Sequence, residues 1–330
     1  RRDDPEKIIN SCCHSEQQLQ VSHGKILQLI RRRRNLVLKL MSQINFKNGA
    51  IVICLDSPDA DLRILGQFEY YGIKNYQTYI SRKAVPFSKT KARLRIATID
   101  FVEAHGSVKE QLAQKDYSSL FQLLCKKESF CPELFQAIVE KMGSPFLQSL
   151  TLDRQVEAIH MFQRAQTRDT CQYEMGLEKN WKKKKPATMH SMHIVLAWRN
   201  VPKHHFLFRL AKVIHRHGLS MQRLNATYID EEGSQTILVM AILLHGSNGE
   251  AVWDVADSND FLRELATIKY FDTIDLIDKK LVAPKIVSGN MANLLRSMIN
   301  FIHQALVNVD SHLYTIETIE ADLCRHPELT

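Results

Sequence analysis

The strongest constraint on the fold is an order of sequence patterns that occurs twice along the chain. In its clearer copy, residues 193–230 read HIVLAWRNVPKHHFLFRLAKVIHRHGLSMQRLNATYID. Apolar residues at helical spacing follow the turn and end at Gly218, while the runs on either side resemble strands. A nearly all-apolar run at 235–246 follows, which is typical of a strand buried on both faces. The sequence therefore predicts an α+β fold with antiparallel sheets.

The second copy of this order predicts a ferredoxin-like βαββαβ unit, in which two helices cover one face of an antiparallel sheet, and the first copy predicts a similar unit with the order βαββα. In the second unit, Ser258 or Asn259 is expected to cap the second helix, and an alternating run at 270–282 is expected to be the last strand. In the first unit, a strand at 49–58 leads to a helix closed near Gly72. Two further strands and a helix reaching about residue 126 complete that unit.

With 330 residues, the chain is long for one core, and more than one domain is expected. Charge runs and pattern changes suggest five parts. They are an N-terminal helical segment (1–48), a first α/β unit (49–130), a helical connection with a basic linker (131–188), a second α/β unit (189–282) and C-terminal helices (283–330).

Bulk composition narrows the classes of protein. The net charge of +8 comes largely from the runs Arg31–Arg34 and Lys182–Lys185. A basic nucleic-acid binder is one interpretation, but no recognition motif accompanies these runs, and solvated faces are the more ordinary one. The seven cysteines are odd in number and irregularly spaced, which favours a reducing, cytoplasmic location. No apolar run is long enough to cross a bilayer.

Motifs for catalysis, cofactors and metals are missing from the sequence. His204 and His205 are adjacent and His215 and His217 lie two apart, so neither pair shares a helix face that could bind zinc. No serine lies in G-x-S-x-G, and neither G-x-G-x-x-G nor a phosphate-binding loop occurs. We therefore predict no catalytic residue, no bound cofactor and no metal site within these 330 residues.

The turn after the first strand of the second unit is the candidate ligand site. There a strand stops, the chain passes Pro202, and a helix begins whose first backbone N–H groups lack partners within the helix. Such a helix end can bind a carboxylate. The candidate ligand-binding residues for a small amino acid are Asn200, Lys203, His204 and His205. The alternative is a plain strand-to-helix loop.

A long apolar stripe marks the C-terminal part. From Met291 to Val309, apolar residues recur at helical spacing, and a shorter helix is expected to begin near Thr315. An apolar face of this kind is normally covered, so we expect it to contact another domain or a neighbouring subunit.

Residues 145–330, and more loosely 49–130, resemble the region ahead of the catalytic core in large NAD-specific glutamate dehydrogenases. The likeness rests on the 193–230 segment, on ILVMAILLHG, and on NMANLLRSMINFIHQALVNVDSHLYTIETIEADLCRHPEL. That family contains ACT-like βαββαβ modules in its N-terminal part. Its glycine-rich substrate segment, catalytic lysine and dinucleotide fingerprint have no matching positions here, so no catalytic residue carries over.

The resemblance implies a noncatalytic regulatory or assembly portion of an NAD-dependent glutamate dehydrogenase. The parent enzyme would interconvert L-glutamate and 2-oxoglutarate, with NAD bound in its catalytic part. The expected partners are that catalytic domain, a small amino-acid effector and further copies of the chain, joined through the C-terminal helices. The alternative is a freestanding ACT-like sensing or interaction module without enzyme activity. A glycine fingerprint encoded beyond Thr330 would separate the two interpretations.

Overall fold

The computed structural model describes residues 42–46, 49–81, 93–102, 117–125, 131–177, 191–230, 235–270 and 275–327. Both basic runs lie outside these ranges, as does most of the N-terminal helical segment expected at 1–48. The helical prediction is wrong for residues 42–46, which form a strand paired with the strand that follows. Two compact units are present, residues 1–255 and residues 256–330. Both expected α/β units therefore share the first compact unit, up to Val255.

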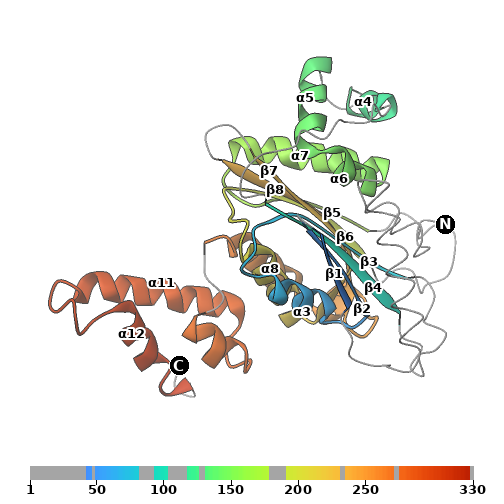
Figure 1. The fold of residues 1–330 in the computed structure, drawn as a ribbon. Helices are drawn as coiled ribbons and strands as arrows, with labels where there is room; N and C mark the ends of the chain where they lie inside the picture. The colour runs from blue at the N-terminus through green and yellow to red at the C-terminus, as the bar shows by residue number, and fades with distance from the viewer. Residues whose placement is uncertain are drawn as a thin grey trace. The chain divides into compact units, whose positions relative to one another are not determined.

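One antiparallel sheet forms the centre of the first compact unit (Figure 1). It has eight strands in the order β1-β2-β4-β3-β7-β8-β6-β5. Every neighbouring pair is antiparallel. The α+β class and the antiparallel sheet agree with the sequence expectation. The strands are β1 (Ser42–Phe46), β2 (Gly49–Leu55), β3 (Ile73–Ile80), β4 (Leu94–Phe101), β5 (Gln172–Leu177), β6 (Met192–Arg199), β7 (Leu219–Asp230) and β8 (Thr236–Gly246).

The sheet consists of two halves with the same topology. Each half runs strand, strand, helix, strand, strand, and the strand orders are β1-β2-β4-β3 and β5-β6-β8-β7. The halves meet at their third strands, where β3 and β7 pair from Asn75↔Thr227 to Tyr79↔Arg223. The term seam is used below for this β3–β7 junction. The twice-repeated order in the sequence thus corresponds to two halves that pair within one chain.

One helix from each half lies on the same face of the sheet, and the two helices pack against each other. They are α3 (Ala60–Gln67) and α8 (Phe206–Arg216). A Cβ added at Gly66 would lie 3.1 Å from the ring of Phe208, so the small residue permits the close approach. Gly218, with φ of +72°, ends α8 as expected, and a Cβ there would lie 2.5 Å from Val255.

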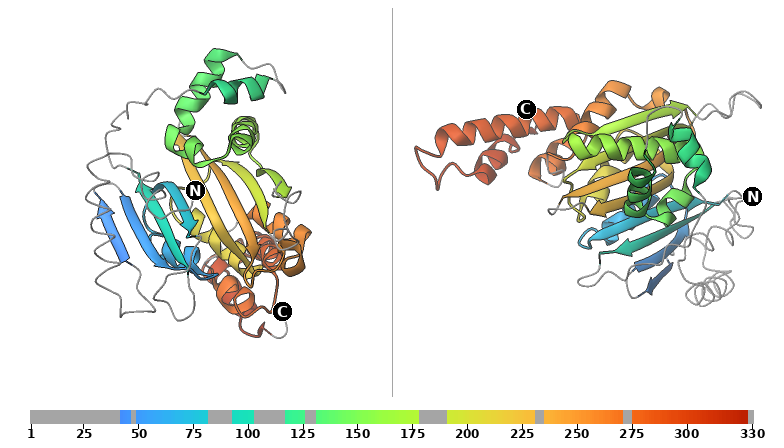
Figure 2. Two further views of the ribbon diagram at one scale, coloured as in Figure 1. Left: turned by 90° about the vertical axis from the view of Figure 1, so that its right-hand side faces the viewer. Right: turned by 90° about the horizontal axis from the view of Figure 1, so that it is seen from above.

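The opposite face of the second half is covered by a helical layer (Figure 2). The longest of these helices, α7, crosses β5, β6 and β8 and buries Ile159 and Phe162 in a core shared with Val195 and Val239. Because β8 has helices on both sides, its side chains are buried almost throughout, which confirms the prediction for this strand. The layer comprises α4 (Ser118–Cys125), α5 (Pro132–Met142), α6 (Ser144–Ser149) and α7 (Leu152–Thr167), and α9 (Val252–Val255) follows β8.

The second compact unit is helical in its described residues. Its apolar core comes from residues in or next to every helix of the unit except the first. These residues are Ile277, Leu281, Val282, Ala292, Leu295, Ile299 and Cys324. The guanidinium of Arg296 donates two hydrogen bonds to the carboxylate of Asp275. The bond from Nη2 to Oδ1 is 2.8 Å long. The elements are α10 (Ser258–Thr267), the π-helical turn η3 (Asp278–Val282), α11 (Gly289–Leu306) and α12 (Ile316–Leu323). The helix expected near Thr315 is confirmed, with Thr315 as its N-cap.

The last strand expected in the second unit is wrong over residues 275–282, which are helical; residues 271–274 lie outside the described ranges. The short apolar run fits a helix as well, because Ile277 and Leu281 lie four residues apart and are both buried. The Asp275 carboxylate also accepts the backbone N–H of Asp278 over 2.8 Å, as a helix cap does. The cap of α10 is Asp257 rather than Ser258 or Asn259.

Strand β5 pairs with β6 and forms the edge of the sheet in the second half. Residues 172–177 belong to the helical connection expected at 131–188, so that prediction is wrong for them. This edge strand exposes Tyr173 and Met175, so its burial does not produce the apolar alternation that marks a half-buried strand. No helix among the described residues combines the length and apolar character needed to span a membrane.

Candidate functional site

The turn between β6 and α8 contains all four predicted ligand-binding residues. Its backbone enters the left-handed region twice, at Asn200 with φ of 56° and at His205 with φ of 59°. His205 is the N-cap of α8, and its side chain makes no capping hydrogen bond. Positive φ at a residue with a Cβ costs free energy, so surrounding contacts must hold this turn.

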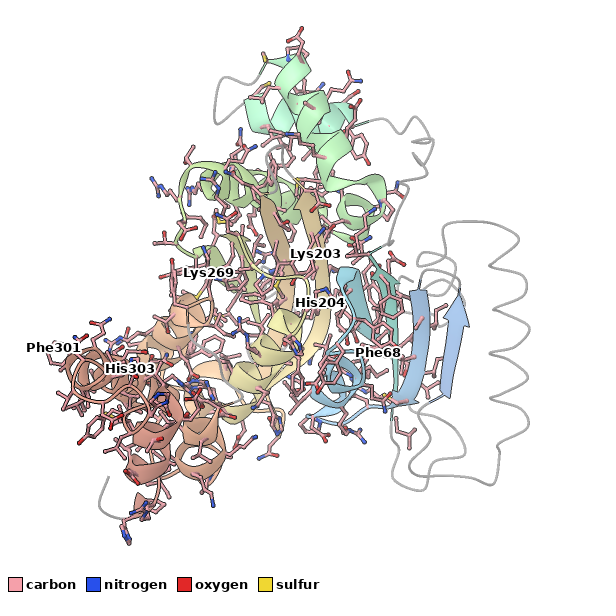
Figure 3. All side chains as sticks on the ribbon, turned by 60° about the vertical axis from the view of Figure 1, so that its left-hand side comes forward. Phe68, Lys203, His204, Lys269, Phe301 and His303 are labelled. Atoms are coloured by element: carbon pink, nitrogen blue, oxygen red, sulfur yellow. The ribbon has the colours of Figure 1, made fainter. Side chains whose placement is uncertain are left out.

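Those contacts come from the first half of the sheet, at the connection between α3 and β3. The backbone N–H of Ile73 donates to the carbonyl of Lys203 over 3.1 Å, and the N–H of His205 donates to the carbonyl of Glu69 over 3.2 Å. His204 Nδ1 lies 3.2 Å from the carbonyl oxygen of Tyr70, whose ring meets His205 edge-on at 5.3 Å. The turn therefore ties one half to the other (Figure 3).

Lys203 carries the positive charge of this turn. Its Nζ lies 2.6 Å from Oδ1 of Asp230, at the end of β7. The Asp230 side chain is 62% exposed and that of Lys203 is 19% exposed, so the pair is open to water on the aspartate side. A pair with one partner in water contributes on the order of 1 kcal/mol. A carboxylate from solution can therefore compete with Asp230 for Lys203 at small cost.

The apolar floor of the turn is closely packed. Trp198 is fully buried and meets the ring of Phe206 at 5.4 Å, and the guanidinium of Arg209 lies 5.6 Å from the centre of the same ring. The hydroxyl of Tyr228 donates to the carbonyl of Pro202 over 2.9 Å. Packing below and hydrogen bonds beside the turn thus fix the backbone that presents Lys203.

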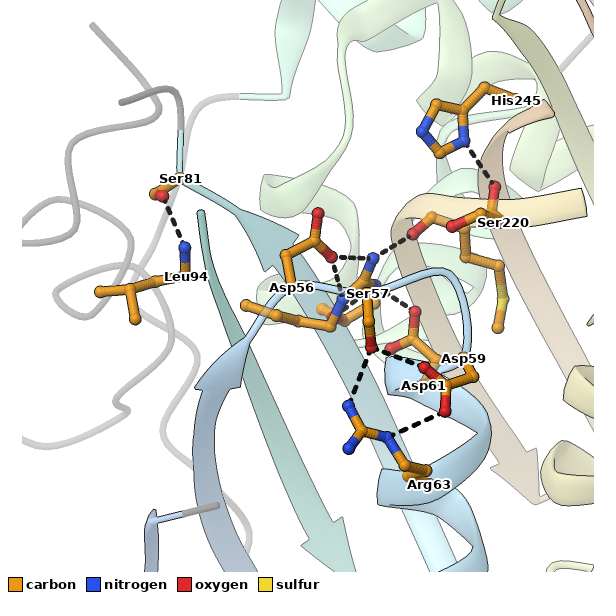
Figure 4. Close-up of polar contacts among 12 residues, drawn as sticks. Asp56, Ser57, Asp59, Asp61, Arg63, Ser81, Leu94, Ser220 and His245 are labelled. Carbon is orange, nitrogen blue, oxygen red and sulfur yellow. Dashed lines mark hydrogen bonds and ion pairs between the residues drawn. The ribbon is translucent and has the colours of Figure 1, made fainter. Parts of the chain in front are cut away.

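The corresponding turn of the first half, between β2 and α3, has the opposite charge. Asp59 pairs with Arg63 over 3.2 Å, and both side chains are about half-exposed. The Ser57 hydroxyl donates to Asp59 over 2.6 Å (Figure 4). Hydrogen bonding from Ser57 and the charge of Arg63 outweigh a desolvation penalty and lower the pKa of Asp59. This turn repels an anion, whereas the turn at Lys203 attracts one.

Behind the acidic turn lies Arg95, a buried arginine that sequence reasoning missed. Its Nε and Nη2 donate to Oδ1 of Asp56 over 2.9 and 2.8 Å, and its Nη1 donates to the buried carboxylate of Asp61. Nη2 also donates to the backbone carbonyl of Met221 over 2.7 Å, and Met221 belongs to β7 of the other half. Arg95 thus joins three elements across the seam.

The charged groups of this cluster shift one another's pKa in a largely buried environment. Burial raises the pKa of Asp61, and the guanidinium of Arg95 limits the rise. Burial also opposes the charge on Arg95, but Asp61 and Asp56 outweigh it and raise the pKa of the guanidinium. Burial and the nearby Asp61 raise the pKa of Tyr76, whose hydroxyl stays protonated and donates to Asp61 over 2.8 Å. The cluster is a structural clamp.

The signal for Arg95 in the sequence is weak. An arginine in an alternating strand is usually placed on the solvent face, and Asp61 lies at a helix start, where acids are ordinary. The four predicted residues, in contrast, are together on one turn. Within the described part of the chain, no group of three or more His, Cys, Asp or Glu side chains could hold a metal ion. The chain matches no protein-family model and no curated protein sequence.

Proposed function

We propose that this chain is the noncatalytic regulatory and assembly portion of an NAD-dependent glutamate dehydrogenase, built from two ACT-like units. The parent enzyme would carry NAD and the catalytic residues in a separate part of the polypeptide. In this proposal, the β6–α8 turn binds the carboxylate of a small amino-acid effector. Asn200, Lys203, His204 and His205 are its binding residues.

The observation that carries the proposal is the pairing of two topologically equal halves through β3 and β7. Because of this pairing, the β6–α8 turn of one half contacts the α3–β3 connection of the other. A ligand bound at this turn would therefore touch both halves. If the ligand binds one relative arrangement of the halves more tightly than another, it shifts the equilibrium toward that arrangement. A regulatory module requires such a shift.

The charge of the turn favours an anionic effector. In our proposal the effector's carboxylate replaces Asp230 as the partner of Lys203 and accepts hydrogen bonds from the start of α8. The exchange loses an ion pair whose aspartate is open to water, so its cost is on the order of 1 kcal/mol. The acidic turn at Asp59 offers no such place, which predicts one effector per chain rather than two.

Calorimetry with a panel of L-amino acids tests the site on the 330-residue chain. Lys203→Ala should weaken binding about tenfold or more, because a hydrogen bond to a charged group is lost. Asp230→Asn should tighten binding by up to about fivefold, because Lys203 loses its competing partner. A gain of affinity cannot arise from misfolding.

Asp59→Ala is the matched control, since it removes an exposed ion-paired acid from the corresponding turn of the first half. It should leave the heats unchanged. If the unsubstituted chain, Lys203→Ala and Asp230→Asn all give equal heats of binding, this turn is not the binding site. Absence of heat with every amino acid in the panel would remove the sensing role.

The enzymatic context has its own test. If the gene continues beyond Thr330, its full product should reduce NAD in the presence of L-glutamate, and residues 1–330 alone should not. A full product that lacks this activity would refute the assignment to a glutamate dehydrogenase and leave the freestanding module as the interpretation.

A further inference from the structure

Helix α11 has an apolar face that no described residue of the second compact unit covers. The stripe predicted between Met291 and Val309 lies mostly on this face rather than in the core. The exposed fractions along the helix are 48% at Met291, 53% at Leu294, 50% at Met298, 73% at Phe301 and 37% at Ile302. Figure 3 labels Phe301, which projects from the helix. An exposed apolar face of this size is typical of an interaction surface.

The other sides of α11 are already in use. Ala292, Leu295 and Ile299 pack into the apolar core of the second compact unit. The amide of Asn290 donates to the carbonyl of Asp260 over 2.8 Å, and that of Asn293 donates to the hydroxyl of Thr267 over 3.1 Å. The helix is therefore fixed in orientation, and its apolar face is presented to the outside by contacts on its other sides.

The spacing of the apolar residues is symmetric about Met298. Leu294 and Ile302 lie four residues to either side of it, and Met291 and Ala305 lie seven to either side. When two identical helices pack antiparallel around a two-fold axis, residue i of one meets residue j of the other, and j meets i. With the axis at Met298, both of these pairs meet apolar to apolar, whereas Phe301 comes opposite Leu295, which lies in the core of the unit.

Charge also favours an identical partner. Residues 289–306 are all described, and their only Lys, Arg, Asp or Glu is Arg296, which is buried and paired with Asp275. The face therefore neither repels its own copy nor selects a charged partner. Beyond the two ends of the helix lie exposed Lys285 and Asp310, and the antiparallel arrangement brings the lysine end of one copy toward the aspartate end of the other.

We infer that a second copy of this chain docks on this face, with α11 antiparallel to α11 about Met298. The inference deepens the assembly role in the proposed function and names its partner and geometry. The five exposed side chains would bury on the order of 500 Å² per copy, which is near the lower end of specific interfaces. A dimer with a dissociation constant in the micromolar range is therefore expected.

Sedimentation equilibrium of the 330-residue chain across a micromolar concentration series measures this dimer. Met298→Glu places two carboxylates opposite each other on the axis and should raise the dissociation constant by about a hundredfold or more. Gln304→Glu adds the same charge on the polar side of the helix and should leave the constant unchanged. Both positions are exposed, so both variants should retain the circular dichroism of the unsubstituted chain.

A charge swap tests the antiparallel geometry. Leu294→Glu alone and Ile302→Lys alone should each weaken the dimer, because a charge then faces an apolar residue. The double variant should recover affinity, because the glutamate of each copy then faces the lysine of the other. No parallel arrangement predicts this recovery.

Three results would overturn the inference. They are a chain that stays monomeric throughout the series, a dimer that Met298→Glu leaves unchanged, and a double variant that is no tighter than the single ones. Met298→Glu should retain the calorimetric response to amino acids. Loss of the dimer and loss of the ligand site are therefore separate observations, and each can fail without the other.

Discussion

Replacing Arg95 with methionine should lower the free energy of unfolding by about 3–5 kcal/mol, the usual cost of breaking a buried ion pair. Arg95 is 1% exposed and Asp61 is 3% exposed, so the aspartate left behind cannot recover the lost interaction from water. Asp56 is partly exposed and can hydrate, so its share of the loss is small. The hydrogen bond to the carbonyl of Met221 across the seam is lost as well.

The loss should depend on pH in a defined direction. In Arg95→Met, burial still raises the pKa of Asp61 and no guanidinium opposes it, so the folded chain binds a proton more tightly than the unfolded chain. Stability of such a group is greatest below the unfolded pKa and falls as pH rises above it. The destabilisation should therefore be largest at neutral pH and shrink as pH approaches about 4.

Urea unfolding followed by the fluorescence of Trp198 measures this effect. Trp198 is fully buried in the first compact unit, and Trp181 and Trp253 are changed to phenylalanine so that it reports alone. Arg63→Met removes an exposed arginine of the neighbouring helix and is the matched control, with an expected loss below about 1 kcal/mol. A loss from Arg95→Met as small as that of the control would refute the clamp.

The double variant Arg95→Met, Asp61→Leu separates pairing from packing. An apolar pair of similar volume commonly recovers the stability of a buried ion pair, so the double variant should be more stable than Arg95→Met alone. Tyr76 then loses its acceptor, which limits the recovery. A double variant that is less stable than Arg95→Met would show that Asp61 acts independently of Arg95.

Two further predictions follow from buried groups. Burial, with Arg154 and Arg223 nearby, lowers the pKa of His193 to about 3 from 6.5, so stability should fall by about 1–2 kcal/mol between pH 7 and pH 5 as the unfolded chain binds the proton. His193→Gln should remove that part of the slope in urea titrations, and an unchanged slope would exclude His193 as its source. Burial raises the pKa of Cys54 to about 11, so among the described cysteines a maleimide should label exposed Cys125 and Cys131 well before Cys54; mass spectrometry of digests checks this, and equal rates would contradict the burial.

The elements with strong periodicity were predictable from the sequence. The run at 235–246 is apolar at nearly every position and became the doubly covered strand β8, and Gly218 ends α8 at positive φ. The pattern at 275–282 was ambiguous because Ile277 and Leu281 suit either secondary structure. The cap at Asp275 and burial against α11 decide for a helix, and neither is visible in local periodicity.

The pairing of the halves was beyond sequence reasoning for a physical reason. Backbone hydrogen bonds between β3 and β7 are independent of side-chain identity, so no residue pattern marks the seam. The four residues of the predicted ligand site lie on one turn because they are neighbours in the chain, and their role in binding stays a prediction. Their contacts with Glu69 and Tyr70, and the pair between Lys203 and Asp230, come from distant segments that only the fold brings together.

The seam has a consequence for biosynthesis. The hydroxyl of Thr227 donates to the side chain of Asn75 across 152 positions of sequence. At about 5–20 residues per second, a ribosome needs roughly 8–30 s to synthesise that interval. During this time the edge of β3 that later pairs with β7 has no partner strand. Its Lys74, Asn75 and Gln77 are the kind of polar side chains that discourage premature pairing with other nascent chains.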